Sequence, residues 1–214
     1  MGNTIIIEGR YDFITGKVVK DIMNVMKKSI GYPEDDLLSL TLPHTLDGTE
    51  DYVIASNGVT FSVDLNIIRQ EGKYKVESSK VDDEDIIEIN IALDPEYEQQ
   101  YYEKIYYKLQ EDVRHEMEHV LQDYAVGDRP APIPETGDET TYEHHSKLDE
   151  VPAMVGGFYR RAKLERRALD EVMIEDLDSE IEKENITKEE AKELFRIWSL
   201  YARRRYPKAI YSED

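Results

Sequence analysis

The chain has no cysteine, and this absence limits the chemistry that it can use. Disulfide bonds and thiolate-bound zinc are both excluded, so any metal must be held by His, Asp or Glu side chains. Phenylalanine and tryptophan are also scarce, with 4 Phe and 1 Trp beside 15 Tyr. Much of the aromatic packing must therefore use rings that carry a polar hydroxyl.

Long hydrophobic runs are missing as well. No segment approaches the roughly 20 apolar residues of a membrane-spanning helix. Residues 1–13 (MGNTIIIEGRYDF) lack the basic region and the apolar stretch of a signal peptide. We therefore expect no membrane partner. The absence of cysteine is most simply explained by a reducing compartment, so we expect a cytoplasmic location.

Basic side chains are fewer than acidic ones, and the excess of acidic side chains lies in one part of the chain. The net charge is −20, and residues 1–150 hold 33 of the 47 acidic and 14 of the 27 basic side chains, a net charge of −19. An acidic surface repels phosphates, so nucleic acid is not an expected partner. An acidic surface most often serves only to interact with water. The more specific interpretation is that it favours basic substrates or partners.

The apolar pattern predicts an α+β fold in one domain over residues 1–214. A small, mostly antiparallel sheet is expected in a strand-rich part (1–94). It is followed by a part that carries two helices and a loop (95–170), and then by a C-terminal helix (171–214). The predicted strands are residues 4–7, 52–55, 59–63, 74–76 and 86–93. The predicted helices are residues 18–30, 95–124, 148–170 and 187–205.

Local signals support several of these boundaries. Asn57-Gly58 between apolar runs is typical of a β-hairpin, and Asp94-Pro95 is typical of a helix start. Thr187 followed by Glu190 predicts a capping box for the last helix.

The helix over 95–124 carries the most informative motif, His115-Glu116-Met117-Glu118-His119. Two His four residues apart lie within about 40° of each other on a helix, so one metal ion can contact both. The apolar positions Leu109, Val113, Met117, Val120 and Tyr124 form a stripe on the opposite side of this helix. Glu116 falls between the stripe and the two His, where its carboxylate can take a proton from water without binding the metal.

Two His leave a catalytic zinc one protein ligand short. The candidates that follow the loop are His144, His145, Asp149 and Glu150. Glu150 is favoured because it begins a predicted helix in Glu150-Val151-Pro152-Ala153, where the small Ala153 allows two helices to approach closely. The alternative for Glu150 is an acid that stabilises the helix N-terminus.

The motif, a proline-containing loop and Asp149-Glu150-Val151-Pro152-Ala153 resemble the small HExxH zinc metallopeptidases with a glutamate third ligand (gluzincin-like), in particular short phage-encoded ones. The resemblance covers about residues 86–165. It implies a zincin-like fold, Zn²⁺ on His115, His119 and Glu150, and Glu116 as the general base of peptide hydrolysis. It also implies a protein or peptide substrate, the host cytoplasm as location, and binding of extended peptide along strand 87–93.

Several points stay open at this stage. The oxyanion-stabilising residue could be any of Tyr142, His144, His145 and Tyr159. An acidic binding or decoy protein that engages a basic partner, with a structural or degenerate metal site, is the alternative function. Two arginine-rich clusters, at 160–167 and 203–205, are interpreted as ion-pair partners of nearby acids rather than as a nucleic-acid surface.

Overall fold

A computed structural model describes residues 3–30, 37–43, 51–54, 58–81, 84–96, 98–126 and 139–212. The chain divides into two compact units, Met1–Leu121 and Gln122–Asp214. Among the described residues, the first unit holds a mixed sheet with one helix and most of a second, and the second unit holds four further helices, so the predicted α+β class is confirmed. That both units form the single predicted domain stays a prediction.

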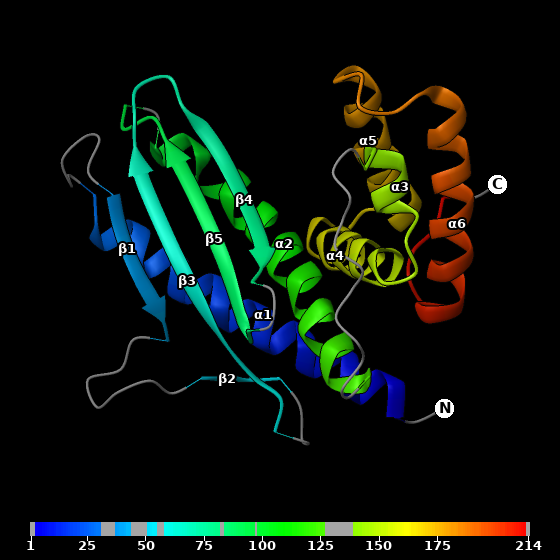
Figure 1. Cartoon of the computed structure of the whole chain (residues 1–214), viewed down its shortest axis with the longest axis horizontal. Coiled ribbons are helices and arrows are strands. Elements are labelled where there is room, and N and C mark those ends of the chain that lie inside the picture. The colour runs from blue at the N-terminus through cyan, green and yellow to red at the C-terminus, as the bar shows by residue number, and fades with distance from the viewer. Residues whose placement is uncertain are drawn as a thin grey trace. The chain divides into compact units, whose positions relative to one another are not determined.

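The sheet of the first unit has the strand order β1-β3-β5-β4 (Figure 1). The strands are β1 (Leu37–Leu42), β3 (Thr60–Arg69), β4 (Tyr74–Lys80) and β5 (Ile86–Leu93), with the short β2 (Tyr52–Val53) paired to β3. All pairs are antiparallel except β3 with β5, so the sheet is mostly antiparallel as predicted. The pairing of β2 with β3 confirms the predicted hairpin, whose residues Ser56 and Asn57 lie outside the described residues.

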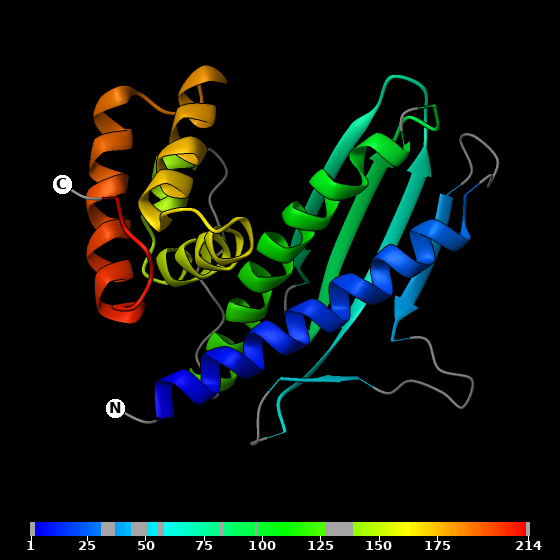
Figure 2. The ribbon, with the colours of Figure 1, turned by 180° about the vertical axis from the view of Figure 1, so that it is seen from behind.

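Two long helices, α1 (Asn3–Lys28) and α2 (Glu98–Val126), lie on the same face of this sheet (Figure 2). Alternate residues of β3 and β5 are buried, which gives each strand one face toward the core. On β5 these residues are Ile87, Ile89, Ile91 and Leu93, as the sequence predicts. They form one apolar core with the inner sides of α1 and α2.

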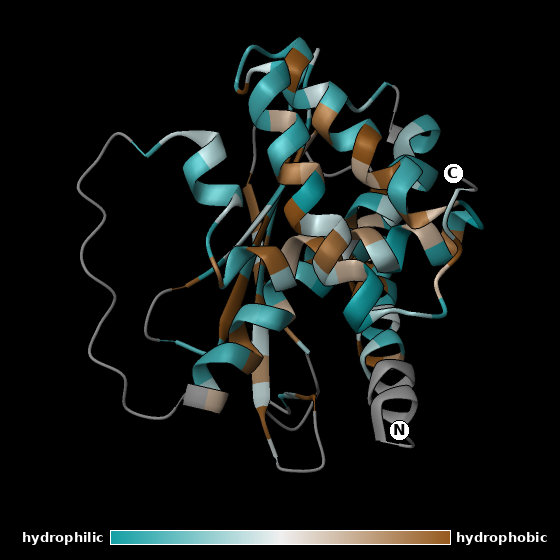
Figure 3. Cartoon of the chain, turned by 90° about the vertical axis from the view of Figure 1, so that its right-hand side faces the viewer, coloured by the Kyte–Doolittle hydropathy of each residue, from teal (hydrophilic) through white to brown (hydrophobic). Residues whose placement is uncertain are grey.

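The second unit contains α3 (Thr141–His145), α4 (Glu150–Glu165), α5 (Leu169–Glu182) and α6 (Lys188–Arg205). Its separate core is built around Trp198 and Phe158, whose ring centroids lie 5.1 Å apart. In Figure 3 hydrophobic and hydrophilic residues alternate along these helices, which is the pattern that buries one side of each. The predicted capping box of α6 is confirmed, because Thr187 accepts from the backbone N–H of Glu190 and Glu190 accepts from that of Thr187.

Two predicted elements and the predicted start of one helix are wrong. Residues 4–7 belong to α1 and not to a strand, since a short apolar run has no period that separates strand from helix. Helix α2 begins at Glu98 rather than at Pro95, and Asp94 instead accepts hydrogen bonds from the backbone N–H groups of Gly72 and Glu96. Because α1 precedes β1, the strands do not all precede the helices.

The third error is the predicted helix 148–170, which is really the end of one helix and the start of another. Arg166 takes a left-handed conformation with φ 57° and ends α4, and α5 begins three residues later. A left-handed C-cap is most often glycine, so an arginine at this position left no signal in the sequence. The acidic segment after Glu171 is consequently helical as far as Glu182.

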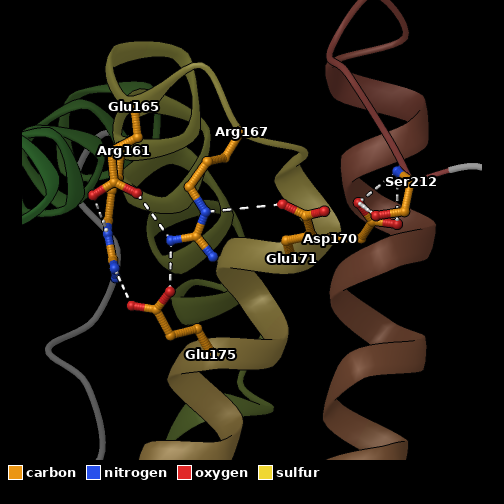
Figure 4. Close-up of polar contacts among 7 residues, drawn as sticks. All are labelled: Arg161, Glu165, Arg167, Asp170, Glu171, Glu175 and Ser212. Atoms are coloured by element: carbon orange, nitrogen blue, oxygen red, sulfur yellow. Dashed lines mark hydrogen bonds and ion pairs between the residues drawn. The ribbon is translucent and has the colours of Figure 1, made fainter.

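The arginines at this junction form ion pairs, as the sequence analysis expects (Figure 4). Arg161 contacts Glu165 and Glu175, and Arg167 contacts Glu165, Glu171 and Glu175. These bonds raise the pKa of Arg167 and lower that of Glu175 against the opposing effect of burial. This part of the cluster at 160–167 is thus neutralised within the second unit.

Candidate metal centre

Helix α2 brings the three residues of the motif together, as its 3.6-residue period requires. The Nε2 atoms of His115 and His119 lie 3.1 Å apart, and the two rings meet edge to face with centroids 4.8 Å apart. His115, Glu116 and His119 are the one group of three possible metal ligands among the described residues, with ligand atoms within 4.8 Å of one another. The helix thus supplies a possible metal-binding triad.

The donor set fits a single zinc ion. Zinc binds imidazole nitrogen at about 2.0–2.1 Å in tetrahedral geometry, which places two ligand nitrogens about 3.3–3.4 Å apart. The observed Nε2 separation of 3.1 Å is close to that value. Two neutral imidazoles at this distance can also share one N–H···N hydrogen bond, with one ring as donor. A metal-binding experiment distinguishes the two arrangements.

Glu116 is 6% exposed, and a residue of the sheet forms a hydrogen bond with its carboxylate. The Ser78 hydroxyl on β4 donates a 2.8 Å hydrogen bond to Oε1 of Glu116. Such a bond restricts the carboxylate to one orientation beside the two imidazoles. The general-base candidate is therefore part of the hydrogen-bonded structure of the first unit.

A second buried carboxylate lies one helical turn before Glu116. Asp112 is 7% exposed and forms a 2.7 Å ion pair with Lys108. Burial raises the pKa of Asp112 to about 7, with smaller contributions from Glu111 and Glu116, while Lys108 opposes the rise. Burial also raises the pKa of the facing Tyr74 on β4.

The other side of α2 is supported by α1 at the level of the motif. Thr15 donates to the Met117 sulfur at 3.5 Å, and the Arg114 guanidinium lies over the Tyr11 ring at 4.8 Å. Arg114 is 1% exposed and forms a 2.8 Å ion pair with Glu118. Glu118 is thus a partly buried ion-pair partner of Arg114.

The apolar stripe of the motif helix is largely as predicted. Leu109, Val113, Met117 and Val120 are fully buried, and His115 and His119 are half-buried. Tyr124 is 48% exposed and does not belong to the core. The two imidazoles therefore lie away from the buried stripe, as the helical angles require.

The residues predicted beyond the loop lie in the second unit. Glu150 begins α4, is 7% exposed, and has Oε2 3.6 Å from Nε2 of His144. Nδ1 of His144 is 3.6 Å from Glu139. Asp149 precedes α4 without a side-chain cap, and its backbone carbonyl accepts from Gln122. The role of Glu150 as third ligand stays a prediction.

The remaining oxyanion candidates, His145, Tyr159 and Tyr142, pack against the core of the second unit. His145 lies against Trp198 with centroids 6.0 Å apart, and burial lowers its pKa. Tyr159 stacks on Tyr206 at 4.1 Å, and Tyr142 packs against the same core. These contacts give each of the three a structural reason to be present, and the oxyanion role stays a prediction for all.

Two further residues of the site were missed by sequence reasoning, Ser78 and Asp112. The inner-face position of Ser78, though not its bond to Glu116, could have been predicted by extending the strand 74–76, because the alternation continues to Lys80 and puts Ser78 on the face of Tyr74 and Val76. Asp112 could have been found from its place four residues before Glu116 on the same helix face. The predicted peptide-binding strand is wrong, since β5 is paired on both sides, and the terminal strand next to it in the described sheet is β4.

Comparison with known proteins adds no family: the chain matches no family model, no curated protein and no solved structure. None of the described helices combines the length and the apolar character needed to cross a membrane.

Proposed function

We propose that the chain is a zinc-dependent peptidase in which His115 and His119 hold the metal and Glu116 acts as the general base. The observation that carries the proposal is the 3.1 Å approach of the two Nε2 atoms beside the buried Glu116 carboxylate. A protein that only binds a partner has no need for a buried carboxylate beside two facing imidazoles. The buried Glu116 carboxylate therefore favours catalysis over the acidic decoy.

The donor chemistry favours zinc among the common metals. Imidazole nitrogen is a preferred zinc ligand, while magnesium and calcium prefer oxygen. We propose Glu150 as the third ligand, since catalytic zinc sites use three protein ligands and keep one position open. When bound, zinc supplies Lewis acidity, which polarises a carbonyl and brings the pKa of water toward neutrality.

Glu116 is the residue that moves the proton. Its carboxylate accepts a proton from the water that attacks the peptide carbonyl and later gives it to the leaving amine. An ionised carboxylate has about four acceptor sites, so the bond from Ser78 does not by itself prevent proton uptake. General-base catalysis of this kind contributes on the order of 10²–10⁴-fold in rate.

A peptide is the substrate that suits the neighbouring sheet edge. β4 is one of the two terminal strands of the described sheet, and its residue Ser78 contacts Glu116 directly. An extended peptide that pairs with a terminal strand gains main-chain hydrogen bonds and is held in a straight conformation. We therefore propose that peptide binds along β4, in place of the inner strand indicated by the sequence.

The test compares the wild type with Glu116→Gln on a proteome-derived peptide library, with the zinc content of both proteins measured. We expect Glu116→Gln to keep its zinc and its fold and to lose at least about 10²-fold in cleavage rate. Its melting temperature should be unchanged or higher, because a buried negative charge is removed. Equal cleavage by both proteins contradicts the assignment of Glu116, and no cleavage by zinc-loaded wild type favours the binding protein.

A further inference from the structure

Ser78 occupies a special place on β4, because its side chain and its backbone face different partners. The side chain lies on the inner face of the strand with the neighbouring alternate residues Val76 and Lys80, and it reaches Glu116. The next residue, Ser79, is exposed on the outer face. Two adjacent serines of one strand thus differ in whether they can contact α2.

The backbone direction of Ser78 follows from the pairing of β4 with β5. The N–H of Val81 donates to the carbonyl of Ile86, so this pair is hydrogen-bonded, and the pairs alternate along an antiparallel ladder. The register places Ser78 opposite Ile89, three pairs further along, which is a non-hydrogen-bonded pair. The N–H and C=O of Ser78 therefore point away from β5, toward an edge with which no described strand pairs.

We infer that Ser78 is a positioning residue for Glu116, linking the peptide-binding edge of β4 to the general base through its hydroxyl. A peptide paired with this edge would bind the backbone of the residue whose side chain orients the carboxylate. Peptide binding then stiffens the strand segment that holds Glu116. This inference rests on the proposed peptidase function and adds a residue that the HExxH motif does not contain.

The kinetic test uses Ser78→Ala, Ser78→Thr and the matched control Ser79→Ala, on the library peptide that the wild type cleaves fastest. We expect Ser78→Ala to lower kcat about tenfold, the effect of one lost hydrogen bond to a charged group, with KM within about twofold because the backbone edge is kept. Ser78→Thr restores the hydroxyl and should recover most of kcat. Ser79→Ala should match the wild type.

A second readout needs neither metal nor activity. In chelator-treated protein, the unfolding midpoints in urea are measured for Ser78→Ala, Glu116→Ala and the double variant. We expect the double variant to lose less stability than the two single losses combined, because both remove the same contact. The corresponding cycle with Ser79→Ala should be additive.

The outcomes separate the two levels of the proposal. If Glu116→Gln is inactive while Ser78→Ala keeps the wild-type kcat, the positioning role is wrong and the peptidase function stands. An additive Ser78–Glu116 cycle, or an equal kcat loss in Ser79→Ala, also overturns the role of Ser78. If wild type and Glu116→Gln cleave equally, the proposed function fails and the positioning role fails with it.

Discussion

Nε2 of His115 and Nε2 of His119 lie 3.1 Å apart on one side of α2, close to the spacing of two ligands on one zinc ion. Helical geometry brings the residues together, and α1 supports the same turns of α2 from behind through Thr15 and Tyr11. The candidate site is thus built on a helix packed on a sheet and on a second helix. Such rigid support is what a preorganised metal site requires.

The first prediction is loss of zinc on removal of either imidazole. His115→Ala and His119→Ala should each lower the zinc content from about one per chain toward zero after dialysis, because a single His in this triad leaves too few ligands. Elemental analysis of purified protein measures the content. Full zinc occupancy in the double variant would show that the metal is held elsewhere.

The second prediction concerns the third ligand. Glu150→Ala should weaken zinc affinity about 10- to 100-fold or more, whereas Glu118→Ala, which removes only the partner of Arg114, should keep it. Competition with a chromogenic chelator measures the affinity. Normal zinc binding by Glu150→Ala, with loss in His144→Ala or His145→Ala, would transfer the role to a histidine.

The third prediction uses the raised pKa of Asp112. With a pKa of about 7 in the folded protein against an ordinary value of 3.8, the folded state holds a proton between these pH values that the unfolded state releases. The free energy of unfolding therefore falls as pH rises through this window, by up to about 4 kcal/mol for a three-unit shift. The side chain introduced by Asp112→Asn cannot ionise, so the free energy of unfolding of this variant should not fall for this reason as pH rises.

Urea unfolding of chelator-treated protein at pH 4, 6 and 8 measures the effect. Asp112→Asn and the wild type should have similar stability at pH 4, and the variant should be more stable by pH 8. Parallel stability curves over this range would mean that Asp112 stays ionised and well paired with Lys108.

How much of the site was predictable depends on the distance in sequence between its parts. The pairing of His115 with His119 and the placement of Glu116 follow from one helical turn, so the motif alone predicts them. The bond from Ser78 to Glu116 joins residues 38 positions apart and depends on the register of β4 with β5 and on how α2 packs. No local pattern carries that information.

The errors in the fold have the same origin. The strand predicted at 4–7 is part of a 26-residue helix, whose support of α2 could not be anticipated from an isolated apolar run. The turn between α4 and α5 depends on a left-handed Arg166, for which the sequence holds no glycine signal. The capping box of Thr187 was predictable because it is complete within four residues.

The fourth prediction tests that capping box. Thr187→Ala should destabilise the protein by about 1 kcal/mol, because the N–H of Glu190 loses its acceptor at the start of α6. Thr187→Ser keeps the hydroxyl and should cost little. Urea unfolding monitored by the fluorescence of Trp198, on the same helix, measures both variants. An unchanged midpoint in Thr187→Ala would show that the cap contributes nothing to the stability of this unit.

The central claim is that His115 and His119 bind one catalytic zinc ion, and anomalous scattering from a crystal of the zinc-loaded protein tests it most directly. Data collected on both sides of the zinc absorption edge should show one peak, about 2.0–2.1 Å from Nε2 of both His115 and His119. The same peak should lie within about 2.0–2.2 Å of a Glu150 oxygen if the third ligand is assigned correctly. A zinc peak away from both histidines, or a shared N–H···N hydrogen bond with no peak at all, would contradict the claim.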